Sequence, residues 1–489
     1  MIDFSLWPPS AEDAARIEGY SQRQKLFDGD HKHAFELTSA KIPAGLASKL
    51  YLAADWPKLI TLVQADMLFG ESPILSQAEQ IQMNNMVEET GLMVSLYEAC
   101  LSASFRGDAV IQIGTGNDGT LCIEEKPAYC YFVERDPDNQ RRILSEALAW
   151  EREDILGNPV LMVEHHFPGL IKREAFALDG PFFASQYTKR RNGKIKLAQV
   201  YGANAPAEEE DTGIERSLLF HIPNFRHGSQ YFGQSDYTEP LISNFDSYND
   251  RLTKIHSILD KHSDPKMVVP YGTLDERGQV KGGSMGLFQL PPGSDPNNPR
   301  YLTWNGELVA AYMELDKLAD LIFKFSEIAP AIFGEDKAGS IESGRAMKFR
   351  FTRTIAKIRR KRLYWHRALM QLLLWAQKYA TAHGLSYLQE DSPVKYAPAR
   401  GYARIQWQDG LPKDTKEDVS TESERVQNRL SSVVSAIQRI DNCTEQAAVD
   451  ELARIRAEEE QNPSGRTTPN TGAAPGAGPG APEPIASAT

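Results

Sequence analysis

The sequence predicts an α+β fold, and three features of its patterning carry that prediction. Before Gly107, apolar residues recur at three- and four-residue steps, a spacing typical of helices. After Gly107 the period falls to two, as in strands, and beyond Asp236 the helical spacing returns. Helix-rich and strand-rich segments are therefore separated along the chain, which indicates the α+β class.

The composition indicates a globular chain in a reducing cytoplasm. Its 489 residues are 41% hydrophobic and 25% charged, enough for two or three ordinary cores. The opening MIDFSLWPPS has no basic segment followed by an apolar run, and the apolar stretch Ala368–Ala376 is too short to cross a bilayer. We expect neither secretion nor a membrane span. Four scattered cysteines without a CxxC pair are interpreted as buried thiols.

The charge balance argues against a protein that grips duplex DNA. There are 54 Lys and Arg against 66 Asp and Glu, a net charge of -12. Affinity for phosphates grows with the number of cations that displace counterions. If DNA is involved, we expect this protein not to hold it tightly.

The N-terminal part is expected to be mainly helical. The apolar spacing predicts helices over Ala11–Phe27, Gly45–Gly70 with a break at Pro57, and Gln77–Phe105. After Gly107, runs such as DAVIQIG, TLCIEE and AYCYFVE alternate between apolar and polar residues and are divided by turn-rich GTGNDG and RDPDN. They predict an antiparallel meander.

A helix, a small β-rich insertion and a second helix follow. The first helix starts at Asp236, which suits an N-cap, and ends near Ser263. Its apolar stripe is Leu241, Phe245, Tyr248, Leu252, Ile255 and Leu259. The runs KMVVP, GLFQL and RYLTW predict strands within residues 266–305. The second helix spans Glu307–Ile328 and ends at Pro330. Its apolar face is Leu308, Tyr312, Leu315, Leu318, Ile322 and Phe325.

The last third contains a loop, a long helix, a strand and a polar helical segment. The loop Ala331–Gly339 precedes a helix that Ser340 caps and that is expected to reach His383. At a rise of about 1.5 Å per residue it would be roughly 65 Å long and would need neighbours along its length. YARIQWQDGLP suggests a strand that returns to the first part of the chain. Thr415–Glu460 predicts two or three polar helices, and the Pro-, Gly- and Ala-rich tail from Pro463 cannot bury enough surface to fold.

No signature of catalysis, cofactor binding or metal binding emerges, and we expect none of the three. GTGNDG at Gly114–Gly119 superficially resembles a phosphate loop, but no Lys-Ser or Lys-Thr follows it, and a hairpin turn fits better. His165 and His166 would point to opposite faces of a strand and have no partner at ligand spacing. HExxH, GxSxG and Walker A sequences are absent.

A basic stretch lies in the predicted long helix between Arg345 and Arg367, with no carboxylate inside it. One interpretation is a stripe that faces DNA, because phosphates would neutralise its cations. The other is ion pairing with acidic surface of the first part of the chain or of an adjacent subunit. The candidate residues are Lys348, Arg353, Lys357 and Arg360. Because an apolar set runs through the same segment, we favour ion pairing.

Five local sequences, in their order along the chain, point to one family. They are MLFGESPIL (67–75), FGQSDYTEPLISNFDSYND (232–250), SGRAMKFRFTRTIAKIRRKR (343–362), WQDGLPKD (407–414) and AAVDELARIRAEEE (447–460). These segments resemble bacteriophage portal proteins, the head–tail connector ring subunits of tailed double-stranded DNA phages, of the siphophage type. The order of the segments, more than any one of them, carries the resemblance.

That resemblance implies a portal fold with an α/β wing, a two-helix stem, a small β-rich clip, a long helix and a helical crown. The implied divisions are a wing over 1–235, stem helices over 236–263 and 307–329, a clip over 264–306, a tunnel loop over 330–339, a long helix over 340–383, a return to the wing over 384–414, a crown over 415–462 and a disordered tail over 463–489.

The same resemblance implies a non-enzymatic structural protein of the virion that is assembled in the host cytoplasm. Copies would form a cyclic homo-oligomer, usually a dodecamer, whose channel passes double-stranded DNA without sequence specificity. Implied partners are the terminase large subunit, head-completion and adaptor proteins, and the major capsid and scaffolding proteins. The implied tunnel-loop residues at the channel are Phe333, Gly334, Glu335, Asp336 and Lys337. The implied clip residues for terminase or adaptor docking are Tyr271, Asp275, Glu276, Arg277 and Lys281.

Two physical arguments agree with that implication, and two other functions stay open. Two helices with narrow apolar stripes cannot enclose a core alone, so neighbouring copies in a closed ring must cover them. A net-acidic chain also suits a channel in which DNA slides. The alternatives are a nucleic-acid-processing enzyme of the packaging apparatus and a head or adaptor protein that forms no axial channel.

Overall fold

The computed structural model divides the chain into two compact units, Met1–Lys413 and Asp414–Thr489. The residues that the structure describes are 2–35, 51–116, 118–139, 142–178, 189–228, 230–263, 267–269, 287–289, 300–301, 308–334, 349–389, 392–408, 415–441 and 443–461. Within these residues, no helix is both long and apolar enough to cross a membrane.

The N-terminal helices of the first unit pack against α5 (Leu92–Arg106), which is buried along most of its length. They are α1 (Ala11–Phe27), α3 (Trp56–Ala65) with a π-helical turn over Asp66–Gly70, and α4 (Gln80–Glu89). The short α2 (His31–Ala34) packs against α1. The helix expected from Gly45 is wrong for residues 51–55, which are not helical, and residues 45–50 lie outside the described part of the chain. α3 begins beside Pro57, where a break was expected, because the first turn of a helix needs no amide there. The single helix expected over Gln77–Phe105 is two helices, since Gly91 adopts a left-handed φ of 58° between them.

Two antiparallel sheets follow, as the period-two pattern predicts. The larger has the strand order β1-β9-β8-β7-β6-β5, with β10 paired to β8, and the smaller has the order β11-β3-β4. The bounds are β1 (Leu6–Trp7), β3 (Asp108–Thr115), β4 (Leu121–Lys126), β5 (Tyr131–Arg135), β6 (Ile143–Glu153), β7 (Pro159–Phe167), β8 (Leu170–Leu178), β9 (Lys189–Ile195), β10 (Glu209–Asp211) and β11 (Leu219–Pro223), with a 3-10 turn over Ala128–Cys130 and α6 over Leu197–Tyr201. Thr115 lies opposite Leu121, which confirms the hairpin at GTGNDG.

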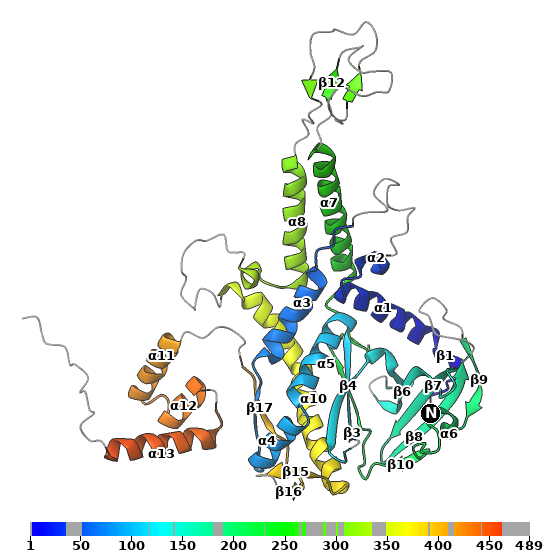
Figure 1. The fold of residues 1–489 in the computed structure, drawn as a ribbon. Helices are drawn as coiled ribbons and strands as arrows, with labels where there is room; N and C mark the ends of the chain where they lie inside the picture. The colour runs from blue at the N-terminus through cyan, green and yellow to red at the C-terminus, as the bar shows by residue number, and fades with distance from the viewer. Residues whose placement is uncertain are drawn as a thin grey trace, which may run out of the picture. The chain divides into compact units, whose positions relative to one another are not determined.

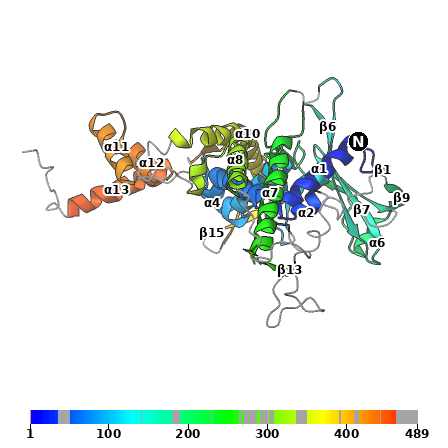
Figure 2. The ribbon, with the colours of Figure 1, turned by 90° about the horizontal axis from the view of Figure 1, so that it is seen from above.

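Two long helices, α7 (Glu239–Ser263) and α8 (Leu308–Ser326), lie side by side (Figures 1 and 2). Between them in sequence, β12 (Met267–Val269) pairs in parallel with β13 (Leu287–Gln289) and antiparallel with β14 (Arg300–Tyr301). These elements confirm the predicted order of helix, β-rich insertion and helix. The predicted N-cap is wrong, because α7 begins after Thr238, whose carbonyl accepts from the amide of Ile242 at 2.9 Å.

The C-terminal part of the first unit is organised by α10 (Thr352–Ala382). Its buried side chains enter the main core beside α5 and the smaller sheet, and they include Trp365, Leu369, Leu372, Ala376 and Tyr379. The helix expected over Ser340–His383 is interrupted: residues 349–350 are helical, but Phe351 leaves the helix with ψ near 0° and is itself buried. Residues 340–348 lie outside the described part of the chain.

The remaining strands of the first unit join distant parts of the sequence. β17 (Arg404–Gln406) pairs with β2 (Ile74–Ser76), which confirms the predicted return of the chain to its first part. The hairpin of β15 (Ser386–Gln389) and β16 (Ser392–Lys395) was not expected from the sequence.

The second unit contains three helices within its described residues, in agreement with the prediction of two or three. They are α11 (Thr415–Gln427), α12 (Val433–Asp441) and α13 (Glu445–Gln461). Glu422 of α11 accepts from Arg439 of α12 at 2.7 and 2.9 Å, so an ion pair links these two helices.

Candidate functional site

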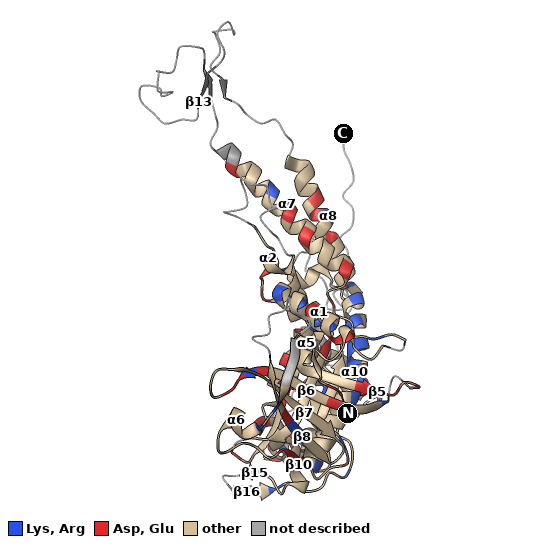
Figure 3. Cartoon of the chain, turned by 90° about the vertical axis from the view of Figure 1, so that its right-hand side faces the viewer, with Lys and Arg blue, Asp and Glu red and all other residues tan. Residues whose placement is uncertain are grey.

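The base of the α7–α8 pair, where α10 begins, holds three charged side chains of the predicted basic stripe. Figure 3 shows Lys and Arg close together along the first half of α10. The chain enters this region just before α7, leaves α8 through Glu327, and passes a 3-10 turn over Pro330–Phe333. Three segments that are far apart in the sequence therefore meet at one place.

The first cluster is buried and is centred on Asp236. Its Oδ1 lies 2.9 Å from Nζ of Lys357, and its Oδ2 accepts from Nζ of Lys361 and from the hydroxyl of Ser104. Lys357 also donates to the carbonyl of Ser326 at 2.9 Å. One carboxylate thus connects the start of α7 to α5 and α10, and through Lys357 to the end of α8.

The electrostatics of this buried cluster follow from two cations sharing one carboxylate. Burial alone would raise the pKa of Asp236, but the charges of Lys357 and Lys361 outweigh it and hold the pKa well below its usual range. Burial lowers the pKa of Lys361, and the charge of Asp236 opposes that shift. With all three groups ionised the cluster carries one excess positive charge.

The second cluster is more exposed and is centred on Glu327. Arg360 donates to both carboxylate oxygens at 2.8 Å, and Nε of Arg353 lies 2.9 Å from one of them. The backbone of Glu327 is left-handed, with φ 58°, a conformation that costs a residue with a side chain about 1–2 kcal/mol. That conformation ends α8, and Thr354 donates to the carbonyl of Glu327 at 3.0 Å, which ties α8 to the first turn of α10.

A cavity of about 350 Å³ lies between the two clusters and is lined by both. Its charged lining consists of Asp236, Glu327, Arg353, Lys357, Arg360 and Lys361. Four cations therefore face two carboxylates. The aromatic rings of Phe225 and Phe325 also line it, and both side chains are partly exposed to solvent. The cavity is suited to an anionic group beside apolar surface.

Three of the four residues of the predicted basic stripe belong to these clusters. Lys357 pairs with Asp236, and Arg353 and Arg360 pair with Glu327. Lys348 lies outside the described residues. The carboxylates that meet these cations come from the same chain: Asp236 lies just before α7 and Glu327 just after α8.

The predicted tunnel-loop and clip residues are described only in part. Phe333 ends the 3-10 turn and packs against Phe323, with ring centroids 5.8 Å apart, and Gly334 follows with a left-handed φ of 74°. The other tunnel-loop residues (Glu335, Asp336 and Lys337) and the clip residues (Tyr271, Asp275, Glu276, Arg277 and Lys281) lie outside the described part of the chain.

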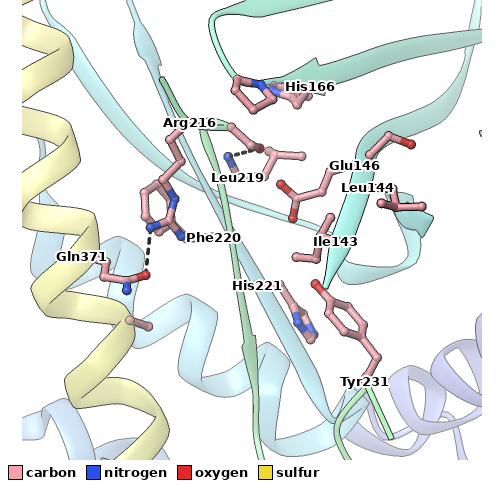
Figure 4. A pocket seen from close by; sticks show the side chains of 14 residues that line it. Ile143, Leu144, Glu146, His166, Arg216, Leu219, Phe220, His221, Tyr231 and Gln371 are labelled. Carbon is pink, nitrogen blue, oxygen red and sulfur yellow. Dashed lines mark hydrogen bonds between the residues drawn. The ribbon is translucent and has the colours of Figure 1, made fainter. Parts of the chain in front are cut away.

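A second cavity, of about 290 Å³, lies among β6, β7, β11 and α10 (Figure 4). Arg216 donates to Gln371 of α10 at 2.8 Å. Glu146, which also lines the cavity, accepts from the buried Tyr131 at 2.6 Å. His166 is buried, and its Nε2 lies 3.6 Å from Glu164, beyond hydrogen-bond distance. Among the described residues no group of three or more His, Cys, Asp or Glu is placed to hold a metal ion.

Sequence reasoning missed the role of Asp236 and of Glu327. A signal for a buried carboxylate was present: Lys357 and Lys361 are four residues apart and interleave with the buried Ile358 and Trp365 on one helix. Two cations on a buried helical face require a carboxylate partner. Nothing in the local pattern says that this partner is Asp236, more than a hundred residues earlier in the chain.

A match to a protein-family model identifies the family of this chain. Residues 221–464 match the family described as "Phage portal protein, SPP1 Gp6-like". The chain belongs to this phage portal protein family. The matched range runs from β11 through α13 and contains both carboxylates that centre the clusters. Portal proteins of this family are structural components of the capsid, and this portal chain has their mixed α+β fold.

Solved structures similar to this portal chain come from gene transfer agent (GTA) particles. A chain of the "Virion of native gene transfer agent (GTA) particle" has a TM-score of 0.43 at 9% identity, over 80% of this chain and 89% of that chain. A chain of the "Neck of native GTA particle computed with C12 symmetry" has a TM-score of 0.41 at 9% identity, over 79% and 89%. No curated protein sequence matches this portal chain significantly.

Proposed function

We propose that copies of this portal chain form a closed ring in the virion, around a channel through which DNA is packaged and ejected. One observation carries the proposal: part of α8 presents apolar side chains that are left uncovered by the residues of its own chain that the structure describes. Val309 is 65% exposed, Met313 67% and Tyr312 45%. Burying such surface against a neighbour would gain about 25 cal/mol for each Å² removed from water.

The exposure along the α7–α8 pair supports a ring. Leu241 and Phe245 of α7 and Ile322 of α8 are fully buried near the base, whereas Leu259, further along α7, is 44% exposed. Two helices alone cannot cover both of their flanks, and heterologous contacts between identical copies close into rings when the rotation permits. The proposal therefore assigns α7 and α8 to the stem of the ring.

The proposed roles of the other segments follow the order of elements. Residues 1–235 form the wing, 264–306 the clip, 330–339 the tunnel loop, α10 the link between wing and crown, and 415–462 the crown. We assign docking of the terminase large subunit, and later of head-completion and adaptor proteins, to the clip. The net charge of -12 supports passage of DNA, because strong attraction would become friction during packaging.

Electron microscopy of the purified full chain tests the ring. Negative-stain images should contain rings with a central hole, and the mass from analytical ultracentrifugation should be a whole multiple of 54.6 kDa. Monomers, or particles without a hole, would overturn the proposal.

The tunnel-loop assignment has its own test. Deleting Glu335–Lys337 leaves the contact between Phe333 and Phe323 in place, so ring assembly should be unchanged while DNA packaging or retention falls. A deletion variant that no longer assembles would show that the loop supports the fold instead.

A further inference from the structure

The two flanks of α8 differ in chemistry. An α-helix turns by about 100° per residue, so Val309, Tyr312, Met313, Asp316 and Asp320 fall within about 100° of arc on one flank. All five side chains are exposed. Among the described residues, neither Asp316 nor Asp320 has a hydrogen-bond or ion-pair partner. One flank of the stem is thus apolar and acidic.

The opposite flank carries the basic cavity. Phe325 lines that cavity and is nine residues beyond Asp316, which places the two side chains on opposite sides of α8. Ile322, which is fully buried, lies on the helix surface about 60° from Phe325 and about 120° from Asp316. α8 therefore has an acidic flank and, on its opposite side, Phe325 beside the basic cavity. The side of the stem that carries this cavity is its basic flank.

On the basic flank, the cations outnumber the carboxylates. Glu327 is shared by two guanidinium groups, and Asp236 by two ammonium groups. Arg353 is the most accessible of the four cations, with its side chain 74% exposed. Phe225 and Phe325, 40% and 47% exposed, place apolar surface beside the cavity. The occupant that fits is a carboxylate beside apolar side chains.

We propose that the acidic flank of α8 in one copy, through Asp316 and Asp320 with Tyr312 and Met313, docks at the Arg353 cavity of the next copy. The inference rests on the ring proposed above and names the residues of its contact. Both requirements of the cavity, a carboxylate and apolar side chains, are met by this flank. A contact between opposite flanks is heterologous, which is the kind that closes into a ring.

The proposal has a geometric requirement. Asp320 and Phe325 are separated by a rise of about 8 Å along α8, and rotation about a ring axis does not move a residue along that axis. The stem must therefore be inclined to the ring axis, so that Asp320 of one copy reaches the level of Arg353 in the next. An extended arginine side chain covers most of the remaining distance.

The phosphates of DNA are the other anions that four cations would attract. The exposed phenylalanines argue for protein, because the phosphate backbone offers no apolar surface to cover them. DNA contact is retained as one outcome of the test.

A charge-swap experiment on the full chain tests the contact. The variants are Asp316→Lys/Asp320→Lys, Arg353→Glu, and the combination of all three. The double variant and Arg353→Glu should each raise the concentration for half-maximal ring assembly by about tenfold or more, since like charges would then face each other. The combined variant should recover a large part of the loss. Assembly is measured by sedimentation velocity at two salt concentrations.

The controls separate the contact from folding and from the ring itself. Glu88→Lys/Glu98→Lys makes the same charge change on exposed helical positions of α4 and α5 and should leave assembly unchanged. Circular dichroism checks that each variant is folded. If the wild-type chain forms rings, and if Asp316→Lys/Asp320→Lys and Arg353→Glu each assemble as well as the wild type, the proposed contact is wrong. The proposal of a ring is then unaffected. If the wild-type chain forms no ring, the proposed function fails. If Arg353→Glu assembles normally but loses affinity for a labelled duplex, the cavity serves DNA.

Discussion

The Asp236 and Glu327 clusters have the same stoichiometry and opposite surroundings. Each has one carboxylate between two cations of α10, which are one helical turn apart at Asp236 and two turns apart at Glu327. The carboxylate of Asp236 and its two ammonium groups are nearly fully buried, whereas the guanidinium groups around Glu327 are largely open to solvent. The two clusters therefore differ in their exposure to solvent and not in the number of charged groups.

Because of this difference in exposure, we expect the two clusters to have different roles. Removing one partner of a buried ion pair leaves a charge without solvent, which is strongly destabilising, whereas an exposed pair contributes little because water replaces the lost contact. The Asp236 cluster therefore fixes α7 and α10 to α5. The Glu327 cluster is free to exchange partners and can serve a contact with another molecule.

The largest expected effect comes from truncating the two carboxylates in parallel. Asp236→Ala should lower the free energy of unfolding by about 3–5 kcal/mol, because two buried ammonium groups lose their counter-charge. Glu327→Ala, the matched change at the exposed cluster, should cost about 1 kcal/mol or less. Urea unfolding at one protein concentration measures both. Equal losses would remove the distinction between the clusters.

The pH dependence of stability sharpens the same comparison. The pKa of Asp236 is depressed in the folded chain, so the unfolded chain binds more protons and stability falls as the pH drops below the unfolded value of about 3.9. The advantage of the wild-type chain over Asp236→Asn should shrink by up to roughly 1.4 kcal/mol per pH unit there. Unfolding curves between pH 6 and pH 3 (about three units) measure it. Parallel curves for the two proteins would contradict the depressed pKa.

A smaller effect is expected when the excess buried cation is removed. Lys361→Met keeps the volume and leaves a balanced pair of Asp236 and Lys357, so it should cost about 2 kcal/mol or less. Lys357→Met should cost more than Lys361→Met, because it also leaves the carbonyl of Ser326 without its donor. Thermal unfolding of both variants gives the order, and the reverse order would mean that Lys361 is the main partner of Asp236.

The smallest effect concerns the backbone of Glu327. Glu327→Gly relieves the left-handed conformation, by about 1 kcal/mol, while it removes the exposed ion pairs, so its stability should stay within about 1 kcal/mol of the wild type. Glu327→Gln keeps the strain and removes the charge, and should be the less stable of the two. A more stable Gln variant would show that the charge, and not the backbone, dominates there.

The sequence predicts the elements of this fold better than their junctions. Periodicity predicts α1, α7, α8 and the antiparallel strands, because each depends on local spacing. The turn at Gly91, the interruption at Phe351 and the hairpin of β15 and β16 were missed, because each depends on backbone conformation or on packing by distant residues. The basic residues of α10 were visible as candidates.

The Asp236 cluster shows most clearly what a local sequence pattern cannot predict. Asp236 has the local features of an N-cap, yet its side chain turns away from α7 to meet Lys357 and Lys361. Breaking such a buried pair costs about 3–5 kcal/mol, whereas losing a helix cap costs about 1 kcal/mol. A contact over 125 positions of sequence has no signature in a local pattern.

A three-dimensional reconstruction of the assembled full chain tests the central claim most directly. The claim predicts a ring with an open axis, α7 and α8 around it, and Val309, Tyr312 and Met313 buried against a neighbouring copy. A particle without an axial opening, or a ring in which these three side chains still face solvent, would contradict it.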